Sequence, residues 1–151
     1  MKLTDKLSTN FTLAELTVSN AAVRKNYTEQ FNPPDNVITA LTELCKNILQ
    51  PLRNTVNASI KVTSGYRCER TNKAIGGAKT SQHIDGEAAD INVEGMSVEE
   101  VYLLIKDSNL PFDQVIQEFD AWVHVSYNST KNRKMCLRAV KKNGKTVYIA
   151  D

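Results

Sequence analysis

The chain has 151 residues, of which 41% are hydrophobic and 24% charged, and its formal net charge at pH 7 is +2. This composition is typical of one soluble globular domain and excludes a disordered or fibrous chain. The small net charge argues against nucleic acid as a partner. We therefore expect a monomer in which residues 1–151 form one domain, with a core at about 11–127 and a basic C-terminal hairpin at about 134–150.

The first residues of the chain do not resemble an export signal. Residues 1–7 lack the apolar stretch of a signal peptide, and no apolar run is long enough to cross a bilayer. Cys45, Cys68 and Cys136 are odd in number and form no C-x-x-C pair, which favours reduced thiols over a disulfide framework. We expect cytoplasmic synthesis without a signal peptide, and no membrane partner.

Two helices are predicted in the first third of the chain. The sequence T-L-A-E at 12–15 is a capping box, so a short helix begins there, and residues 26–34 are expected to be loop. Asp35 is placed to cap a longer helix, which we expect Pro51 to kink or end. The buried stripe of that helix has apolar residues at spacings of three and four: Val37, Leu41, Leu44, Ile48 and Leu52.

Strands and helices alternate through the middle of the chain. Ile60 and Val62 alternate with polar residues as in a short strand, which runs into the turn-prone Ser64-Gly65. Residues 67–75 are predicted to be helical and to stop at the glycine pair 76–77. A further strand is expected around Ile91 and Val93, and S-V-E-E at 97–100 is a second capping box that opens another helix.

The last third of the chain is typical of antiparallel strands. Residues 115–127 are predicted to form two strands joined by a tight turn, and Asn143-Gly144 predicts a further hairpin. In the second strand, alternation places Trp122 and His124 on the face opposite Val123 and Val125. The whole pattern predicts an α+β fold with helices early and an antiparallel sheet late.

The stretch S-Q-H-I-D-G-E-A-A-D at 81–90 contains one of the only two histidines. Gly86 allows the loop after His83 to turn, Ala88 and Ala89 permit close backbone packing, and Asp90 enters the next strand. Two imidazoles, those of His83 and His124, and one carboxylate form a familiar zinc set whose open fourth position is typical of a catalytic site. The spacing of His83 and Asp90 alone does not distinguish ligands from ordinary polar residues.

The motifs occur in an order that resembles the zinc peptidases of the D-alanyl-D-alanine carboxypeptidase superfamily, which includes VanX- and VanY-like dipeptidases, phage endolysins and the Hedgehog signalling domain. These motifs are S-G-Y-R at 64–67, G-G at 76–77, S-x-H-x-x-G-x-A-x-D at 81–90 and W-V-H at 122–124. The resemblance covers about 11–127 and implies helices packed on a central antiparallel sheet. It also implies zinc ligands and substrate-binding residues: His83, Asp90 and His124 for zinc, and Arg67, Ser81 and Trp122 for substrate.

The general base is the point where the sequence departs from part of this superfamily. Ala121 stands three places before His124, where many of the carboxypeptidases have an acidic residue. We predict Glu118 as the base, because hairpin pairing brings it to the face of His124 and the Hedgehog domain resembles the chain at that spacing. Asp120 is the alternative base, although aspartate is also a common turn residue.

The resemblance implies a zinc-dependent peptidase that hydrolyses peptidoglycan stem peptides, as a carboxypeptidase or an endopeptidase. The overall pattern looks most like compact forms encoded by phages and prophages, which would act at the cell wall after release or from a phage particle. Two alternatives remain: a zinc-containing binding module, and a virion structural module with little or no turnover. A nucleic-acid role for the basic C-terminal segment ranks last, because no helix there carries a regular basic face.

Overall fold

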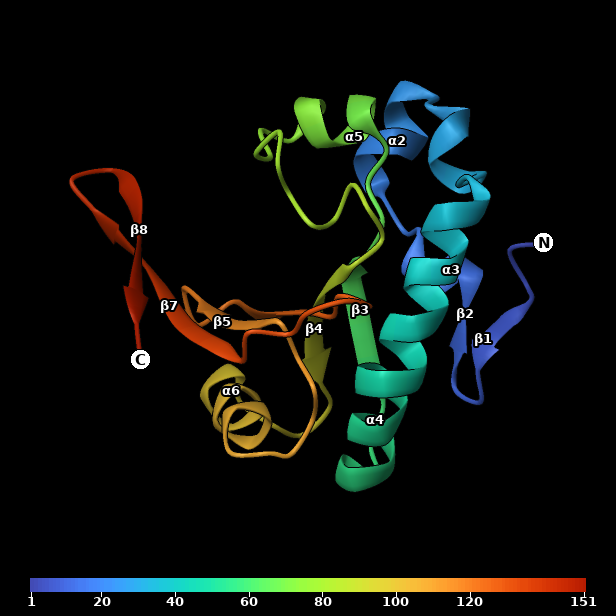
Figure 1. The fold of residues 1–151 in the computed structure, drawn as a ribbon. Helices are drawn as coiled ribbons and strands as arrows, with labels where there is room; N and C mark the ends of the chain where they lie inside the picture. Colours follow the sequence, from blue (N-terminus) through green and yellow to red (C-terminus); the bar gives the residue numbers. More distant parts are fainter.

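A six-stranded sheet forms the centre of the computed structural model, which describes residues 1–151 (Figure 1). The strand order is β3-β4-β6-β5-β7-β8. These strands are β3 (Ile60–Ser64), β4 (Ala88–Val93), β5 (Gln114–Glu118), β6 (Trp122–Ser126), β7 (Met135–Lys142) and β8 (Lys145–Ala150). All neighbours are antiparallel except β5 and β7, which run parallel. The predicted α+β class is confirmed, but the sequence pattern did not predict the parallel pair.

One face of the sheet packs against helices. A long helix runs through α3 (Asp35–Leu44), the π-helical segment η2 (Cys45–Leu49) and α4 (Gln50–Val56), and the predicted apolar stripe is buried. The helix continues past Pro51. Proline has no N–H to donate, and the wide π turn just before it means that the regular hydrogen bond from its nitrogen is not required. The second helix on this face is α6 (Val98–Lys106), which shares a single hydrophobic core with the long helix.

Short elements surround this frame. They are β1 (Lys6–Ser8), β2 (Phe11–Thr12), α1 (Leu13–Leu16), α2 (Asn20–Lys25), η1 (Thr28–Phe31) and α5 (Glu69–Ala74). Both predicted capping boxes are present, at Thr12 and Ser97. The prediction that Asp35 caps α3 is wrong. Pro34 is the N-cap, and Asp35 is the first helical residue, where the helix dipole favours a carboxylate.

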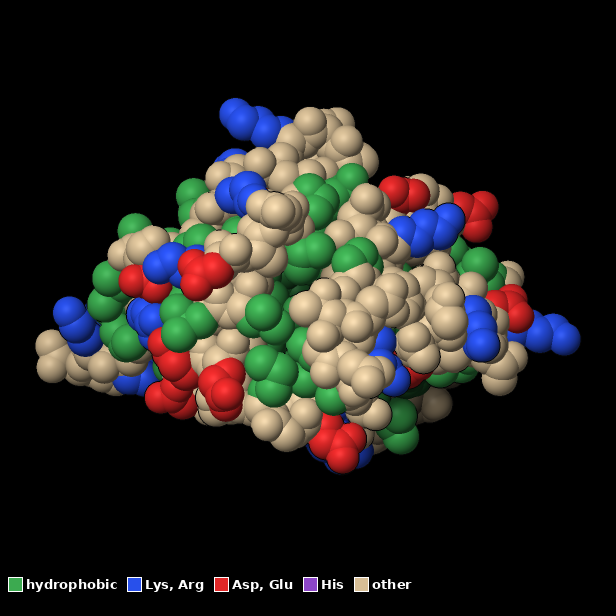
Figure 2. Space-filling model, turned by 90° about the horizontal axis from the view of Figure 1, so that it is seen from below, with side chains coloured by type: hydrophobic (Ala, Val, Ile, Leu, Met, Phe, Trp, Pro, Cys, Tyr) green, Lys and Arg blue, Asp and Glu red, His purple; other side chains and the backbone are tan.

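The surface seen from below carries no large patch of one charge. Acidic and basic side chains are interspersed over it, with apolar groups between them (Figure 2). No helix combines the length and the apolar character that spanning a membrane requires. The opposite face of the sheet is not covered by α3, α4 or α6, since its side chains alternate with those of the core, and it carries the polar residues considered next.

Candidate metal centre

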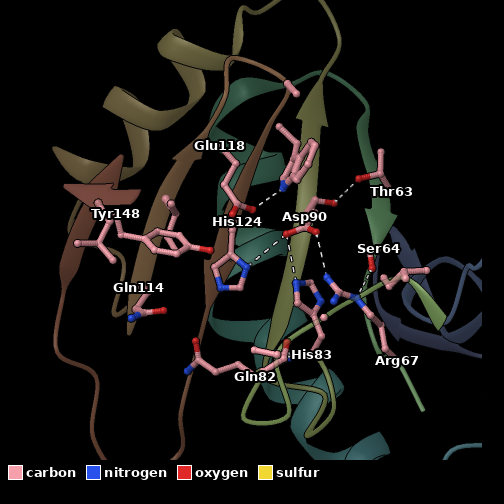
Figure 3. Close-up of a pocket in the computed structure, with 18 of the residues that line it drawn as sticks. Thr63, Ser64, Arg67, Gln82, His83, Asp90, Gln114, Glu118, His124 and Tyr148 are labelled. Carbon is pink, nitrogen blue, oxygen red and sulfur yellow. Dashed lines mark hydrogen bonds and ion pairs between the residues drawn. The ribbon is translucent and has the colours of Figure 1, made fainter. Parts of the chain in front are cut away.

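Sheet register brings the three predicted metal ligands together. Asp90 of β4 lies directly opposite His124 of β6, so their side chains share the open face of the sheet. His83 reaches the same point from the loop before β4 (Figure 3). All three side chains are buried, and one ligand atom from each lies within 4.8 Å of the others.

The distances within this cluster suit a single metal ion. Asp90 Oδ1 lies 3.2 Å from His83 Nε2 and 3.3 Å from His124 Nδ1. Ligands that each stand about 2.0–2.1 Å from a tetrahedral zinc ion are separated by about 3.3 Å. Asp90 Oδ1 is also buried without a well-formed hydrogen bond. A buried oxygen that two imidazole nitrogens approach in this way fits a shared cation, and this donor set is typical of zinc.

The loop that carries His83 is held in position by backbone contacts. His83 Nδ1 lies 2.7 Å from the carbonyl oxygen of Gly65, a contact that fixes the ring with Nε2 directed into the cluster. The Ser81 hydroxyl accepts a hydrogen bond from the backbone N–H of His83. Gly86 has φ +74° and lies against Val37, where a side chain would clash, so glycine is required at this turn.

The surroundings of His83 and Asp90 favour the protonation states in which these two residues bind a metal. Burial lowers the pKa of His83, which favours the neutral imidazole. Burial acts to raise the pKa of Asp90, but the close approach of the His124 and His83 rings outweighs burial, so the pKa of Asp90 lies well below its usual range. An ionised aspartate beside a neutral histidine is the state in which both coordinate a cation.

Arg67 lies at one side of this cluster in a fixed orientation. Its Nε donates to Ser64 Oγ at 3.0 Å and its NH1 donates to Asn72 Oδ1 at 3.1 Å. Its NH2 lies 3.5 Å from Asp90 Oδ2. Burial lowers the pKa of Arg67, although guanidinium stays charged at neutral pH. Of the five N–H donors of the fork, these contacts engage three, and the remaining two are available to a ligand.

Glu118 and Trp122 form a pair beside the cluster. They lie opposite each other across the β5–β6 hairpin, and Trp122 Nε1 donates to Glu118 Oε2 at 2.5 Å. Burial raises the pKa of Glu118, and the negative charge of Asp90 adds to this effect. A carboxylate with a raised pKa is better suited to accept and return a proton than an exposed one.

Asp120, the alternative base, lies elsewhere. It sits in the β5–β6 turn with φ 56°, and its carboxylate accepts a hydrogen bond from Gln117 Nε2. Gln117 belongs to the opposite face of the sheet, since it alternates with Glu118 along β5. The structure thus brings Glu118, and not Asp120, to the ligand cluster.

The ligand cluster opens into one cleft with a volume of about 980 Å³. The predicted substrate residues Arg67, Ser81 and Trp122 all contribute to its walls, as do Glu118 and the three candidate ligands. Sequence reasoning missed several further polar lining residues, among them Gln82, Gln114 and Tyr148. It also missed Asn72, which lies behind Arg67. For the two glutamines and Asn72, no local sequence signal marks a role, because each depends on contacts with distant segments.

The α+β fold and the His-Asp-His cluster fit a metallopeptidase. Residues 9–126 match the family described as Peptidase M15, and the chain belongs to this family of zinc D-Ala-D-Ala carboxypeptidase-like peptidases. Peptidases of the family depend on a metal, typically zinc. No protein of curated function matches the sequence.

Proposed function

We propose that the protein is a zinc-dependent peptidase that hydrolyses peptidoglycan stem peptides, with Glu118 as its general base. The observation that carries this proposal is the convergence, in one cleft, of a buried His-Asp-His set, a partly buried carboxylate and an oriented guanidinium. Each of these three parts has a separate task in peptide hydrolysis.

The ligand set His83, Asp90 and His124 would hold the metal. Zinc in such a site polarises a peptide carbonyl and makes water nucleophilic near neutral pH. Glu118 takes the proton from the attacking water and passes it to the leaving amine. The indole N–H of Trp122 keeps the Glu118 carboxylate in place during these transfers.

Arg67 supplies the binding contact. Its two uncommitted N–H groups suit a substrate carboxylate or carbonyl oxygen, because the planar fork is already fixed by Ser64 and Asn72. The order of motifs and the superfamily resemblance support a peptidoglycan stem peptide as that substrate. The protein would then act as a monomer at the cell wall, after release from the cell or from a phage particle.

The test is a comparison of the wild-type chain with Glu118→Gln, measuring zinc content and the release of products from purified peptidoglycan fragments. We expect about one zinc per chain in both proteins. Loss of the general base should lower kcat by at least about 10²-fold. Asp120→Asn is the matched control, because it removes a neighbouring carboxylate that does not line the cleft, and it should retain wild-type kcat.

The other outcomes separate the alternatives. A Glu118→Gln protein that remains fully active while Asp120→Asn is inactive would transfer the role of base to Asp120. Zinc binding without hydrolysis by any variant would favour a zinc-containing binding module, and co-purification with phage particles would then identify a virion component. A wild-type protein that binds no zinc would refute the metallopeptidase proposal.

A further inference from the structure

The β7–β8 hairpin brings a residue into the cleft from outside the part of the chain that matches the family. The match ends at residue 126, whereas β7 and β8 extend the sheet beyond β5 and form its outer edge (Figure 1). Tyr148 of β8 nevertheless lines the same cleft as His83 and Arg67. The cleft wall on this side is therefore built by the C-terminal hairpin.

Sheet register explains why Tyr148 faces the candidate metal centre. Glu118 of β5 pairs with Ala139 of β7, and Ala139 pairs with Tyr148 of β8. Directly paired residues project from the same face of a sheet. Trp122, which pairs with Glu118, belongs to the same row. Tyr148 thus continues the row of side chains that contains the candidate base.

The small residue between Glu118 and Tyr148 leaves space for the phenol. Neighbouring strands are about 4.8 Å apart, so Glu118 and Tyr148 are separated by about twice that distance across Ala139. The methyl group of Ala139 does not fill this space, and the ring of Tyr148 extends along the sheet toward His124 (Figure 3). The hydroxyl of Tyr148 points to the ligand cluster from the side opposite Arg67.

The hydroxyl is available to a ligand. Figure 3 shows no hydrogen bond or ion pair between Tyr148 and the residues around it, and the side chain remains 55% exposed. By contrast, the hydroxyl of Tyr102 is engaged with Asp151. Burial raises the pKa of Tyr148, and a tyrosine phenol is protonated at neutral pH in any case, so the hydroxyl remains a donor.

Contacts on the opposite side hold the hairpin in place. Arg138 of β7 donates to both carboxylate oxygens of Glu99 at the start of α6, at 2.7 and 2.8 Å. Its Nε donates to Asp151, which also accepts a hydrogen bond from Tyr102 of α6. These contacts fix the base of the hairpin to the helix layer, so the position of Tyr148 is set by the fold.

We propose that Tyr148 is a catalytic residue whose hydroxyl donates a hydrogen bond to the oxygen of the scissile carbonyl as that oxygen gains negative charge. This inference rests on the proposed peptidase function. The substrate would lie across the ligand cluster, held by Arg67 from the β3 side and by Tyr148 from the β8 side. A donor aimed at developing charge stabilises the transition state more than the ground state, so it acts on kcat rather than on KM.

The test compares the zinc-loaded wild-type chain with Tyr148→Phe, which removes only the hydroxyl. We expect kcat on a soluble stem peptide to fall by about 10²-fold with KM changed by less than about threefold, as for loss of one oxyanion donor. The matched control is Tyr27→Phe, since Tyr27 lies under Arg70 outside the cleft and its ring contact survives the change. Zinc content and circular dichroism establish that both variants fold and bind metal as wild type does.

A binding measurement separates this inference from the proposed function. A phosphinate dipeptide, in which a tetrahedral phosphinic group replaces the scissile peptide group, is titrated into each zinc-loaded protein. Binding is followed by the fluorescence of Trp122, the only tryptophan, which lines the cleft. We expect at least about tenfold weaker binding to Tyr148→Phe than to wild type.

The outcomes are distinct. Wild-type kcat in Tyr148→Phe, or a change in KM alone, would overturn the role of Tyr148 while the peptidase remains established. A wild-type protein that hydrolyses no stem peptide would refute the proposed function, and the phosphinate would then decide the role of the hydroxyl. Equal affinity of both proteins for the phosphinate would overturn the role of the Tyr148 hydroxyl. Weaker binding of the phosphinate to Tyr148→Phe would retain Tyr148 as a ligand contact.

Discussion

At the scale of single residues, Asp90 lies between the candidate metal site and the candidate substrate contact. Its Oδ1 faces His83 and His124, and its Oδ2 faces Arg67. The guanidinium therefore fixes the carboxylate in the orientation that presents Oδ1 to the histidines. The same guanidinium is also the candidate substrate contact, so we expect a change at Arg67 to affect both metal binding and substrate binding. Orienting partners of this kind commonly affect metal affinity as well as activity.

Replacing Arg67 by lysine tests whether substrate and zinc binding need the planar guanidinium group or only its charge. Lysine keeps the charge, but a single ammonium group cannot reproduce contacts with Ser64, Asn72 and Asp90 together. We expect KM for stem peptides to rise by about tenfold or more in Arg67→Lys, with weaker zinc binding. Steady-state kinetics and a zinc titration by Trp122 fluorescence measure both effects.

The matched control for that substitution is Arg70→Lys. Arg70 lies in α5, close to Arg67 in sequence, and it pairs with Glu29 on the surface, away from the cleft. Exposed ion pairs contribute little, so KM and zinc affinity should stay at wild-type values in this variant. Equal behaviour of the two lysine variants would show that charge alone, without the fork, suffices at Arg67.

At the scale of elements, Asp113 joins three segments that build the cleft. It stands just before β5, and it accepts hydrogen bonds from the backbone N–H and the guanidinium of Arg133, in the segment that leads to β7. It also accepts a hydrogen bond from Gln82, which precedes the first candidate ligand. The Asp113 side chain is buried, so these contacts replace the water that its carboxylate loses.

This contact makes stability depend on pH in a defined direction. Hydrogen bonding to Arg133 lowers the pKa of Asp113 to about 2, below the value of about 3.9 in an unfolded chain. The stabilisation is therefore complete above about pH 5 and is lost as the pH falls through about 2. We expect Asp113→Asn to be less stable than wild type by about 1–2 kcal/mol at pH 7, and the difference to be about halved at pH 3.

Urea unfolding of both proteins at pH 7 and pH 3 measures these differences. Subtracting the variant from the wild type removes the contribution of the other carboxyl groups. Arg133→Met provides the partner control: in that background, replacing Asp113 should no longer change the pH dependence as it does in wild type. A difference between wild type and Asp113→Asn that is independent of pH would mean that packing, rather than ionisation, accounts for the loss.

At the scale of the whole molecule, the candidate ligands come from separate parts of the fold. His83 lies in a loop, Asp90 on β4 and His124 on β6, so a bound ion would link them only in the folded state. A ligand that binds only the folded state stabilises it by mass action, by about 2.7 kcal/mol at a hundred times its Kd.

Zinc removal should therefore lower thermal stability. For a domain of 151 residues, this free energy corresponds to a Tm increase of about 5–10 °C on adding zinc to protein treated with chelator. Differential scanning calorimetry measures the shift. Mg²⁺ should have no such effect because it prefers oxygen ligands, and His83→Gln should abolish the response to zinc. An equal shift in His83→Gln would place the stabilising ion at another site.

Local signals in the sequence predicted much of the fold, and the resemblance to zinc peptidases implied the candidate metal ligands. Capping boxes at Thr12 and Ser97 were predicted because the signal lies within four residues, and the structure confirms them. Alternation along β6 predicted that His124 lies on the face of the sheet opposite Val123 and Val125, as observed. The structure also brings His83, Asp90 and His124 together, although the motif that contains His124 is far in sequence from the one that contains His83 and Asp90.

The features that were missed depend on long-range register. The pairing of β5 with β7 is parallel, and no local pattern in either strand specifies its partner or direction. Tyr148 enters the cleft only as a result of that pairing, so its place in the cleft wall was not visible in the sequence. Pro51 was expected to kink or end the helix, but the helix continues through a π turn just before it, which no local pattern predicted.

The parallel pairing of β5 and β7 also has a consequence for the order of folding. The β7–β8 hairpin closes locally, within microseconds, whereas its docking joins strands that are distant along the chain. Without the docked hairpin, β5 is the edge of the sheet, and the β4–β6 register that aligns Asp90 with His124 requires neither β7 nor β8. We expect the nascent cleft to pass through a stage that is open on the β8 side, in which a metal ion enters freely before Tyr148 arrives and narrows the access.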